Sequence, residues 1–186
     1  MFKRTKILWL LLGAIAIVVF LVFRFGVDTN QKNNFPNKMR ISSPSFNAGQ
    51  ELPVPFTCQG DGHNPSLAIS GVPGEAVSLA FIMDDPDAPK GTFVHWIVWD
   101  IGRDTTRIDE GLPPPMSIEG QNSLGQVGYV APCPPSGTHR YYFRLYALDK
   151  DLELDEQTTK EELLTAMTGH IIDQAEIIGL VTASKP

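Results

Sequence analysis

The stretch 84–100, DDPDAPKGTFVHWIVWD, limits what this chain can fold into more than any other part of the sequence. It joins two apolar runs, 77–83 and 93–101, which have the length and composition of buried strands. Proline fixes φ and removes a backbone donor, so the DPDAP segment at 85–89 fits neither a helix nor an ordinary ladder. We therefore expect a stiff turn at a strand end, where binding sites are commonly built.

Two histidines stand at comparable positions relative to proline-rich turns. His95 lies inside the apolar run that follows Pro86 and Pro89, and His139 begins another predicted strand just after the CPPSG segment at 133–137. An imidazole inside an apolar strand needs a hydrogen-bond partner, and the nearby aspartates are the obvious candidates. The two turns could therefore converge on one pocket.

The chain from Met39 onward predicts strands joined by turns, with 16 glycines and 15 prolines in the whole sequence. No helix separates the predicted strands, which is not a βαβ pattern. The expected strands are 39–42, 53–58 (an edge strand, because it contains two prolines), 66–70, 77–83, 93–101, 139–149 and 175–181, and the expected long loops are 102–119 and 120–128.

One helix is expected in this region, over residues 158–168. Thr158 and Glu161 have the spacing of a capping box, Leu164 belongs to an apolar stripe, and Gly169 suits the C-terminal stop. The predicted fold class is therefore mainly β, an antiparallel β-sandwich with a peripheral helix.

Residues 1–25 have the composition of a membrane anchor. Lys3, Arg4 and Lys6 precede seventeen uncharged residues, 7–23. Seventeen is the lower limit for a transmembrane helix, and no small-x-small cleavage site follows. We expect an uncleaved signal-anchor that makes a single pass, with a secreted or periplasmic protein after cleavage as the alternative.

Residues 26–38 are polar and predict a linker, so that 39–186 form one domain. The basic cluster before the apolar run predicts that the domain is extracytoplasmic. Of 15 basic and 21 acidic residues, six basic and one acidic precede Met39, which leaves 9 basic and 20 acidic residues in the domain, a balance of −11. This acidity argues against a nucleic-acid partner, which requires clustered lysine and arginine.

Three kinds of site are compatible with the two turns. Imidazoles and free backbone N–H groups can bind an anion or a phosphate. His95 and His139 with Asp85 or Asp87 are suitable ligand types for a metal, but no HxH or HExxH spacing supports this, and we expect none. Cys133 beside a histidine could be a nucleophile, although nothing marks it as activated.

Several of these residues also have a plain structural explanation. Arg140 can pair bidentately with a carboxylate of the DPDAP turn and so join the two loops. A histidine in an apolar strand is more often a core residue than a ligand, and we expect Trp96 and Trp99 in the core or the pocket wall. We assign no function to His63 or His170.

Taken together, these motifs resemble the phosphatidylethanolamine-binding proteins, also called Raf kinase inhibitor-like proteins, and most closely their bacterial and archaeal branch. The resemblance rests on DPDAP at 85–89, His95 with its neighbouring tryptophan, and CPPSGTHRY at 133–141. It extends over almost the whole predicted domain and includes the ending GHIIDQAEIIGL at 169–180. It implies antiparallel sheets with a small anion-binding pocket near one edge.

Transferred position by position, the resemblance implies a pocket for phosphate, acetate-like anions or phosphoethanolamine head groups. Asp87 and Arg140 would be supporting residues, and the resemblance implies no catalytic residue, metal or cofactor. The implied ligand-binding residues are Asp85, Ala88, Pro89, His95, Cys133, Pro134, His139 and Tyr141.

The resemblance also bears on the two cysteines. The segments of Cys58 and Cys133 both approach the pocket in the family pattern, so an exported domain could contain a disulfide between them. Ala131 replaces a glycine of the bacterial pattern. The C-terminal helix of animal members is missing here, so their kinase regulation is not transferred.

The sequence therefore predicts a membrane-tethered binding protein, not an enzyme, for a small anionic or phosphorylated ligand. The alternative is a protein-interaction module that inhibits a kinase or a protease by binding it. A hydrolase is the least favoured function, and a homodimer is compatible with the sequence.

Overall fold

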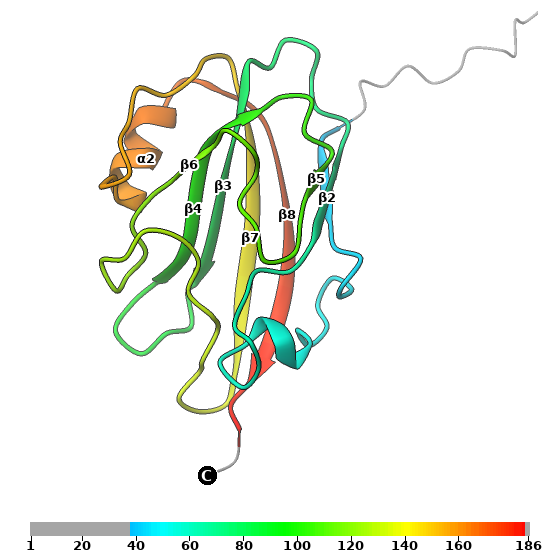
Figure 1. Ribbon diagram of the computed structural model, residues 1–186, viewed down its shortest axis with the longest axis vertical. Helices are drawn as coiled ribbons and strands as arrows, with labels where there is room; N and C mark the ends of the chain where they lie inside the picture. The colour runs from blue at the N-terminus through cyan, green and yellow to red at the C-terminus, as the bar shows by residue number, and fades with distance from the viewer. Residues whose placement is uncertain (1–37, 185–186) are drawn as a thin grey trace, which may run out of the picture. The chain divides into compact units, whose positions relative to one another are not determined.

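Two antiparallel sheets pack face to face in the computed structural model, which describes residues 38–184 (Figure 1). The predicted anchor and all but the last residue of the predicted linker lie outside the described residues. From Lys38 to residue 184, no helix has the length and apolar character needed to cross a membrane.

The smaller sheet has three strands and the larger sheet has five. The smaller sheet has the order β1-β2-β5 and contains β1 (Arg40–Ser42), β2 (Leu67–Ser70) and β5 (Arg107–Ile108). The larger sheet has the order β6-β4-β3-β7-β8 and contains β6 (Ile118–Glu119), β4 (Phe93–Gly102), β3 (Ser78–Asp85), β7 (Thr138–Leu148) and β8 (Ile171–Thr182).

Strand β3 lies at the centre of the larger sheet, and all eight of its residues are buried. Because side chains alternate along a strand, Phe81 and Met83 point into the core between the sheets, whereas Ala80 and Ile82 point to the opposite face. This second face is covered by α2 (Lys160–Met167) and the chain before it (Figure 1). Burial on both faces explains why this strand is a continuous apolar run rather than an alternating one.

The helix confirms the predicted element but not its predicted cap. The capping box is formed by Thr159 and Glu162, one residue later than expected. Thr158 is instead buried, and its carbonyl accepts the backbone N–H of Gln121, so it belongs to the preceding loop. Leu164, expected in the apolar stripe, is 37% exposed.

The predicted edge strand at 53–58 was wrong. Val54–Phe56 form a short 3-10 helix, η1, in which Phe56 N–H bonds to the carbonyl of Pro53. Proline favours this turn because its fixed φ is close to that of a 3-10 helix. The residues just before Pro53 pair with the edge of β8 instead. Leu52 N–H donates to the carbonyl of Leu180 in that strand.

The predicted loop at 102–119 contains the two-residue strands β5 and β6. Two other strands are longer than expected. β3 continues through Asp85, and β8 begins at Ile171 rather than at residue 175.

Gly120 allows the loop after β6 to lie directly on the larger sheet, and a side chain there should destabilise the fold. A Cβ atom would lie 2.7 Å from Ile97 Cδ1, Thr158 O and Trp99 Cζ3. We expect Gly120→Ala to lower the free energy of unfolding by about 1–3 kcal/mol. Gly74→Ala is the matched control, because a Cβ there meets nothing within 4 Å. Urea unfolding measures both, and equal midpoints for the two variants would contradict the close approach.

Candidate functional site

A β-bulge in β4 sets the position of His95. Met83 pairs with Trp96 and Asp84 pairs with Val94, so His95 is an extra residue without a partner in β3. A bulge redirects side chains, and here it places two consecutive residues towards the inter-sheet side. Trp96 enters the core between the sheets, and the His95 ring packs edge-on against Tyr141 at 5.2 Å between centroids.

Asp85 and His139 meet on this same side, at the ends of the adjacent strands β3 and β7. His139 Nδ1 lies 2.7 Å from Asp85 Oδ2, and both side chains are buried. Asp85 Oδ1 accepts the backbone N–H of Asp87 at 2.8 Å, which fixes the start of the DPDAP turn. The preceding residue, Asp84, points to the opposite face and pairs with Arg144 and Lys160.

A cavity of about 290 Å³ opens beside Asp85, His95 and His139. It brings together all of the predicted ligand-binding residues except Tyr141. Tyr141 is fully buried behind the wall, against His95. The residues that line the cavity are Asp85, Ala88, Pro89, Phe93, His95, Leu124, Val130, Ala131, Cys133, Pro134, Pro135 and His139.

A larger surface cavity of about 720 Å³ lies elsewhere, between β1 and the β8 side of the larger sheet. Arg144, Gln174 and Glu176 are among the residues that line it, and none of the predicted site residues do. Size alone therefore does not identify the site. The smaller cavity is the candidate because buried titratable groups converge on it.

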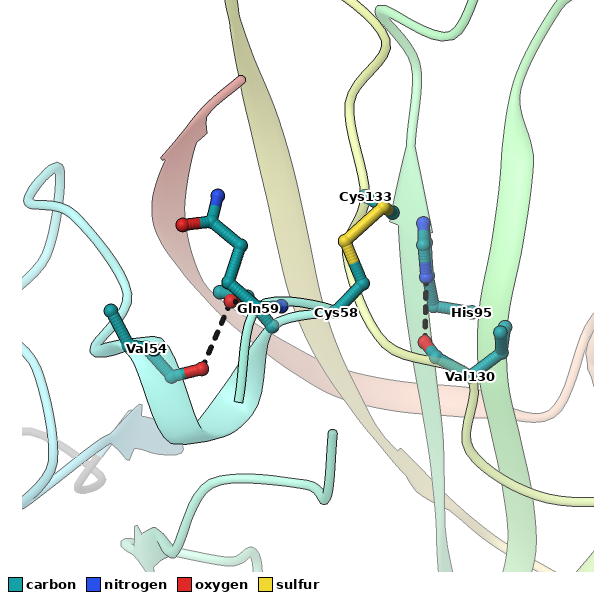
Figure 2. The surroundings of a disulfide bond; sticks show 7 residues. Val54, Cys58, Gln59, His95, Val130 and Cys133 are labelled. Carbon is teal, nitrogen blue, oxygen red and sulfur yellow. Dashed lines mark hydrogen bonds between the residues drawn. A yellow bond between two sulfur atoms is a disulfide. The ribbon is translucent and has the colours of Figure 1, made fainter. Parts of the chain in front are cut away.

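His95 is held as a neutral side chain at neutral pH. Its Nδ1–H donates to the carbonyl of Val130 at 2.8 Å (Figure 2). Burial lowers the pKa of His95 below its ordinary value, and the Val130 bond and the charge of Asp85 oppose this shift only in part. The phenol of Tyr141 stays protonated, because burial and the Asp85 carboxylate raise its pKa.

Asp87 and Arg140 join the two proline-rich turns, as predicted from the sequence. Arg140 Nε and Nη2 donate to the two carboxylate oxygens of Asp87 at 2.9 and 2.7 Å, and the backbone N–H of Arg140 donates to the same carboxylate. These bonds lower the pKa of Asp87 to about 2. The pair lies at the surface beside the cavity and acts as a clamp rather than as part of its wall.

The disulfide between Cys58 and Cys133 closes one side of the site, with 5.3 Å between the Cα atoms (Figure 2). Both cysteines are exposed to solvent, and Cys133 also lines the cavity. The same two segments are joined by Cys58 N–H to Pro132 O and by Tyr129 Oη to Phe56 O. Cys133 has no thiol in this state, so the nucleophile hypothesis is wrong for this structure.

The metal hypothesis also finds no support in the part of the chain that the structure describes. Within it, no group of three or more histidine, cysteine, aspartate or glutamate side chains has the arrangement of a metal site. His63 and His170, to which we assigned no function, pair with Glu110 and Asp149 away from the cavity.

Sequence reasoning missed the apolar wall of the cavity. Phe93 lies 4.7 Å from the His95 ring, between centroids, and Leu124 comes from the loop after β6. Asn122 shapes this loop, since its side chain donates to the carbonyl of Gly128 and accepts the backbone N–H of Leu124. An apolar leucine inside a polar, glycine-rich loop was the available signal.

The sequence profile of the Phosphatidylethanolamine-binding protein family matches residues 42–182. A UPF0098 protein of Methanothermobacter thermautotrophicus is 46% identical over 147 residues, which cover 76% of this chain and 97% of that protein. A UPF0098 protein of Archaeoglobus fulgidus is 38% identical over 99% of this chain and 64% of its own length.

Two solved structures have a similar fold. One is a putative phosphatidylethanolamine-binding protein homologue from Chlamydia trachomatis, 42% identical with a TM-score of 0.77, and the match covers 80% of this chain and 99% of that one. The other is YbcL of Escherichia coli, described as a member of the mammalian family, 27% identical with a TM-score of 0.74 over 79% of this chain and 99% of that one.

Removing the disulfide should destabilise the domain without unfolding it. The bridge joins cysteines 75 positions apart, and such bridges contribute about 2–4 kcal/mol to stability. We expect the Cys58→Ser/Cys133→Ser variant to have a lower urea midpoint than the oxidised protein and the same midpoint as the reduced protein. Two thiols that react with an alkylating agent, in protein isolated without reductant, would contradict the bridge.

Acid should release the clamp between Asp87 and Arg140. Because the pKa of Asp87 is lowered to about 2 from 3.8, the pair stabilises the folded state above pH 3.8, and this contribution is lost as pH falls towards 2. Over this window we expect the wild type to lose more stability than Asp87→Asn, which has no such carboxylate. Urea midpoints at several pH values measure the difference, and parallel pH dependences would rule the contribution out.

Proposed function

Because this chain belongs to the phosphatidylethanolamine-binding protein family, we propose that its domain binds the anionic or phosphorylated head of a small ligand in the cavity beside Asp85. One observation carries the proposal: two buried histidines, His95 and His139, line the same small cavity. In each ring, one nitrogen is hydrogen-bonded to the protein, and the other has no hydrogen-bond partner among the described residues.

The shape and lining of the cavity support a small ligand. A volume of about 290 Å³ is at the lower end for ligand pockets. The wall contains the polar side chains of Asp85, His95 and His139, whereas Phe93, Leu124, Val130 and several prolines supply apolar surface. A compact charged head group attached to a less polar portion fits a wall of this mixed composition.

We propose binding without turnover. Among the described residues, no serine, threonine or cysteine is hydrogen-bonded to either imidazole, so the nucleophile–base pair of covalent hydrolases has no counterpart beside them. Cys133, which lines the cavity, is bonded to Cys58.

We further propose that the domain works outside the cytoplasm, tethered by the apolar segment at 7–23. The disulfide between Cys58 and Cys133 supports this location, because such bonds persist in oxidising compartments.

A second function, inhibition of another protein by binding it, has one observation in its favour. Leu124 and Val127 are 57% and 44% exposed, and both lie in the loop beside the cavity. Exposed apolar side chains at a pocket rim are compatible with a protein partner as well as with a ligand.

Titration followed by NMR tests the anion pocket. A fragment of residues 38–186 is suitable for this experiment. The Chlamydia trachomatis chain forms this fold, and the match to the present chain covers 99% of its length. We expect phosphoethanolamine and inorganic phosphate, at millimolar concentration, to shift the imidazole signals of His95 and His139 saturably. The signals of His63 and His170 serve as internal controls and should not move.

Ethanolamine is the matched control ligand, because it lacks the phosphate and should leave all four histidines unchanged. Equal shifts with ethanolamine would show that the cavity recognises the amine instead. No shift at His95 and His139 with any of these compounds would overturn the proposed pocket and favour the protein-binding function.

A further inference from the structure

We propose that the cavity binds an acid rather than a bare anion, so that each oxyanion enters together with one proton. The proton is brought by the ligand or taken from solvent by an imidazole, and it ends between a ligand oxygen and an imidazole Nε2. The proposal rests on the function proposed above and defines the protonation state of the ligand class.

The tautomer of His95 follows from its partner. Nδ1 lies 2.8 Å from the carbonyl oxygen of Val130, and a carbonyl can only accept a hydrogen bond. Nδ1 therefore carries the hydrogen. Since a neutral imidazole has a single N–H, Nε2 of His95 presents a lone pair.

The same reasoning applies to His139. Its Nδ1 lies 2.7 Å from Oδ2 of Asp85, and the other oxygen of that carboxylate already accepts the backbone N–H of Asp87. An ionised carboxylate accepts hydrogen bonds only, so Nδ1 of His139 is the donor. In the neutral form of this imidazole, Nε2 therefore presents a lone pair, as in His95.

Within the described part of the protein, neither Nε2 atom accepts a hydrogen bond, and neither is closed off from solvent. No described residue is hydrogen-bonded to Nε2 of His95 or of His139. Across residues 38–184, the one side-chain polar atom that is both sealed from solvent and without a partner is Trp99 Nε1. Both imidazole nitrogens are therefore open to solvent, and both histidines line the cavity.

The side chains around the two imidazoles supply no positive charge that could take the place of a proton beside a bound anion. No lysine or arginine lines the cavity, and the only charged carboxylate in its wall is Asp85. Arg140, beside His139 on β7, is bound to Asp87. On β3 the neighbouring Asp84 faces away and is paired with two cations.

One tyrosine packs against His95. Tyr141 on β7 remains neutral, because burial raises the pKa of its phenol. With both imidazoles neutral, an oxyanion in this cavity faces two lone pairs and a carboxylate. A proton on Nε2 converts one lone pair into a donor, and the charge of Asp85 stabilises the imidazolium that results.

The expected ligands are oxyacids that share a proton with the site, such as phosphate monoesters and carboxylic acids. Binding with uptake of one proton strengthens about tenfold for each unit by which pH falls, as long as the free groups are deprotonated. This dependence separates the cavity from anion sites built on arginine or lysine, which stay charged through neutral pH.

Isothermal titration calorimetry of the domain at residues 38–186 tests the proposal, with sulfate and inorganic phosphate as probes. Sulfate has no proton to bring near neutral pH, so the proton must come to the protein. We expect about one proton to be taken up per sulfate at pH 8, measured from binding heats in buffers of different ionisation enthalpy, and roughly tenfold tighter binding at pH 7.

Variants then identify the imidazole that takes the proton. Glutamine supplies a permanent N–H near the position of Nε2, so either His95→Gln or His139→Gln should bind sulfate with less proton uptake and a flatter pH dependence. His63→Gln is the matched control, because His63 is paired with Glu110 outside the cavity, and it should behave as the wild type.

The outcomes separate the two proposals. Saturable binding of the wild type with no proton uptake and no pH dependence overturns the acid-binding proposal and leaves the anion pocket standing. No saturable binding of sulfate or phosphate between pH 6 and 8 overturns the anion pocket, and the acid-binding proposal with it. The wild-type measurement decides both, even if a variant fails to fold.

Discussion

The buried carboxylate of Asp85 is the interaction on which the rest of the site depends. A charge on the inter-sheet side of a central strand is costly unless it is fully paired. Asp85 meets this requirement with the imidazole of His139 on one oxygen and the backbone N–H of Asp87 on the other. Strand β7, strand β3 and the DPDAP turn are therefore held in one arrangement, and the cavity is the space that this arrangement leaves.

The side chains of two consecutive aspartates at the end of β3 point to opposite faces of the same sheet. Asp85 belongs to the site, whereas Asp84 pairs with Arg144 and with Lys160, the first residue of α2. The peripheral helix is thus attached one residue away from the group that organises the cavity. Strand alternation alone produces this division, because neighbouring side chains point to opposite faces.

Much of the fold follows from local patterns in the sequence. The long apolar runs predicted β3 and β4, and period-two alternation predicted β7. The two proline-rich turns with their histidines predicted that one cavity would contain them. The pairing of Arg140 with Asp87 was also predictable, because the guanidinium geometry matches a carboxylate of the turn.

Other features depend on information that no single segment contains. The bulge at His95 exists only relative to the register of β3, so the alternation of β4 could not reveal which way that side chain points. The capping box had two possible registers, and burial of Thr158 against a distant loop selected the later one. The apolar wall near Leu124 depends on how its loop is held against β4, where Ser123 and Val94 exchange hydrogen bonds, and this is a tertiary effect.

The bond between Cys58 and Cys133 closes the chain between them into a covalent ring. The segments of the protein before Cys58 and after Cys133 are not part of this ring. This ring contains β2 to β6 and the long surface loops that connect them. A protease that cuts once in any of these loops leaves a single molecule, whose pieces separate only after reduction. The ring would therefore keep the strands on both sides of a first cut covalently joined.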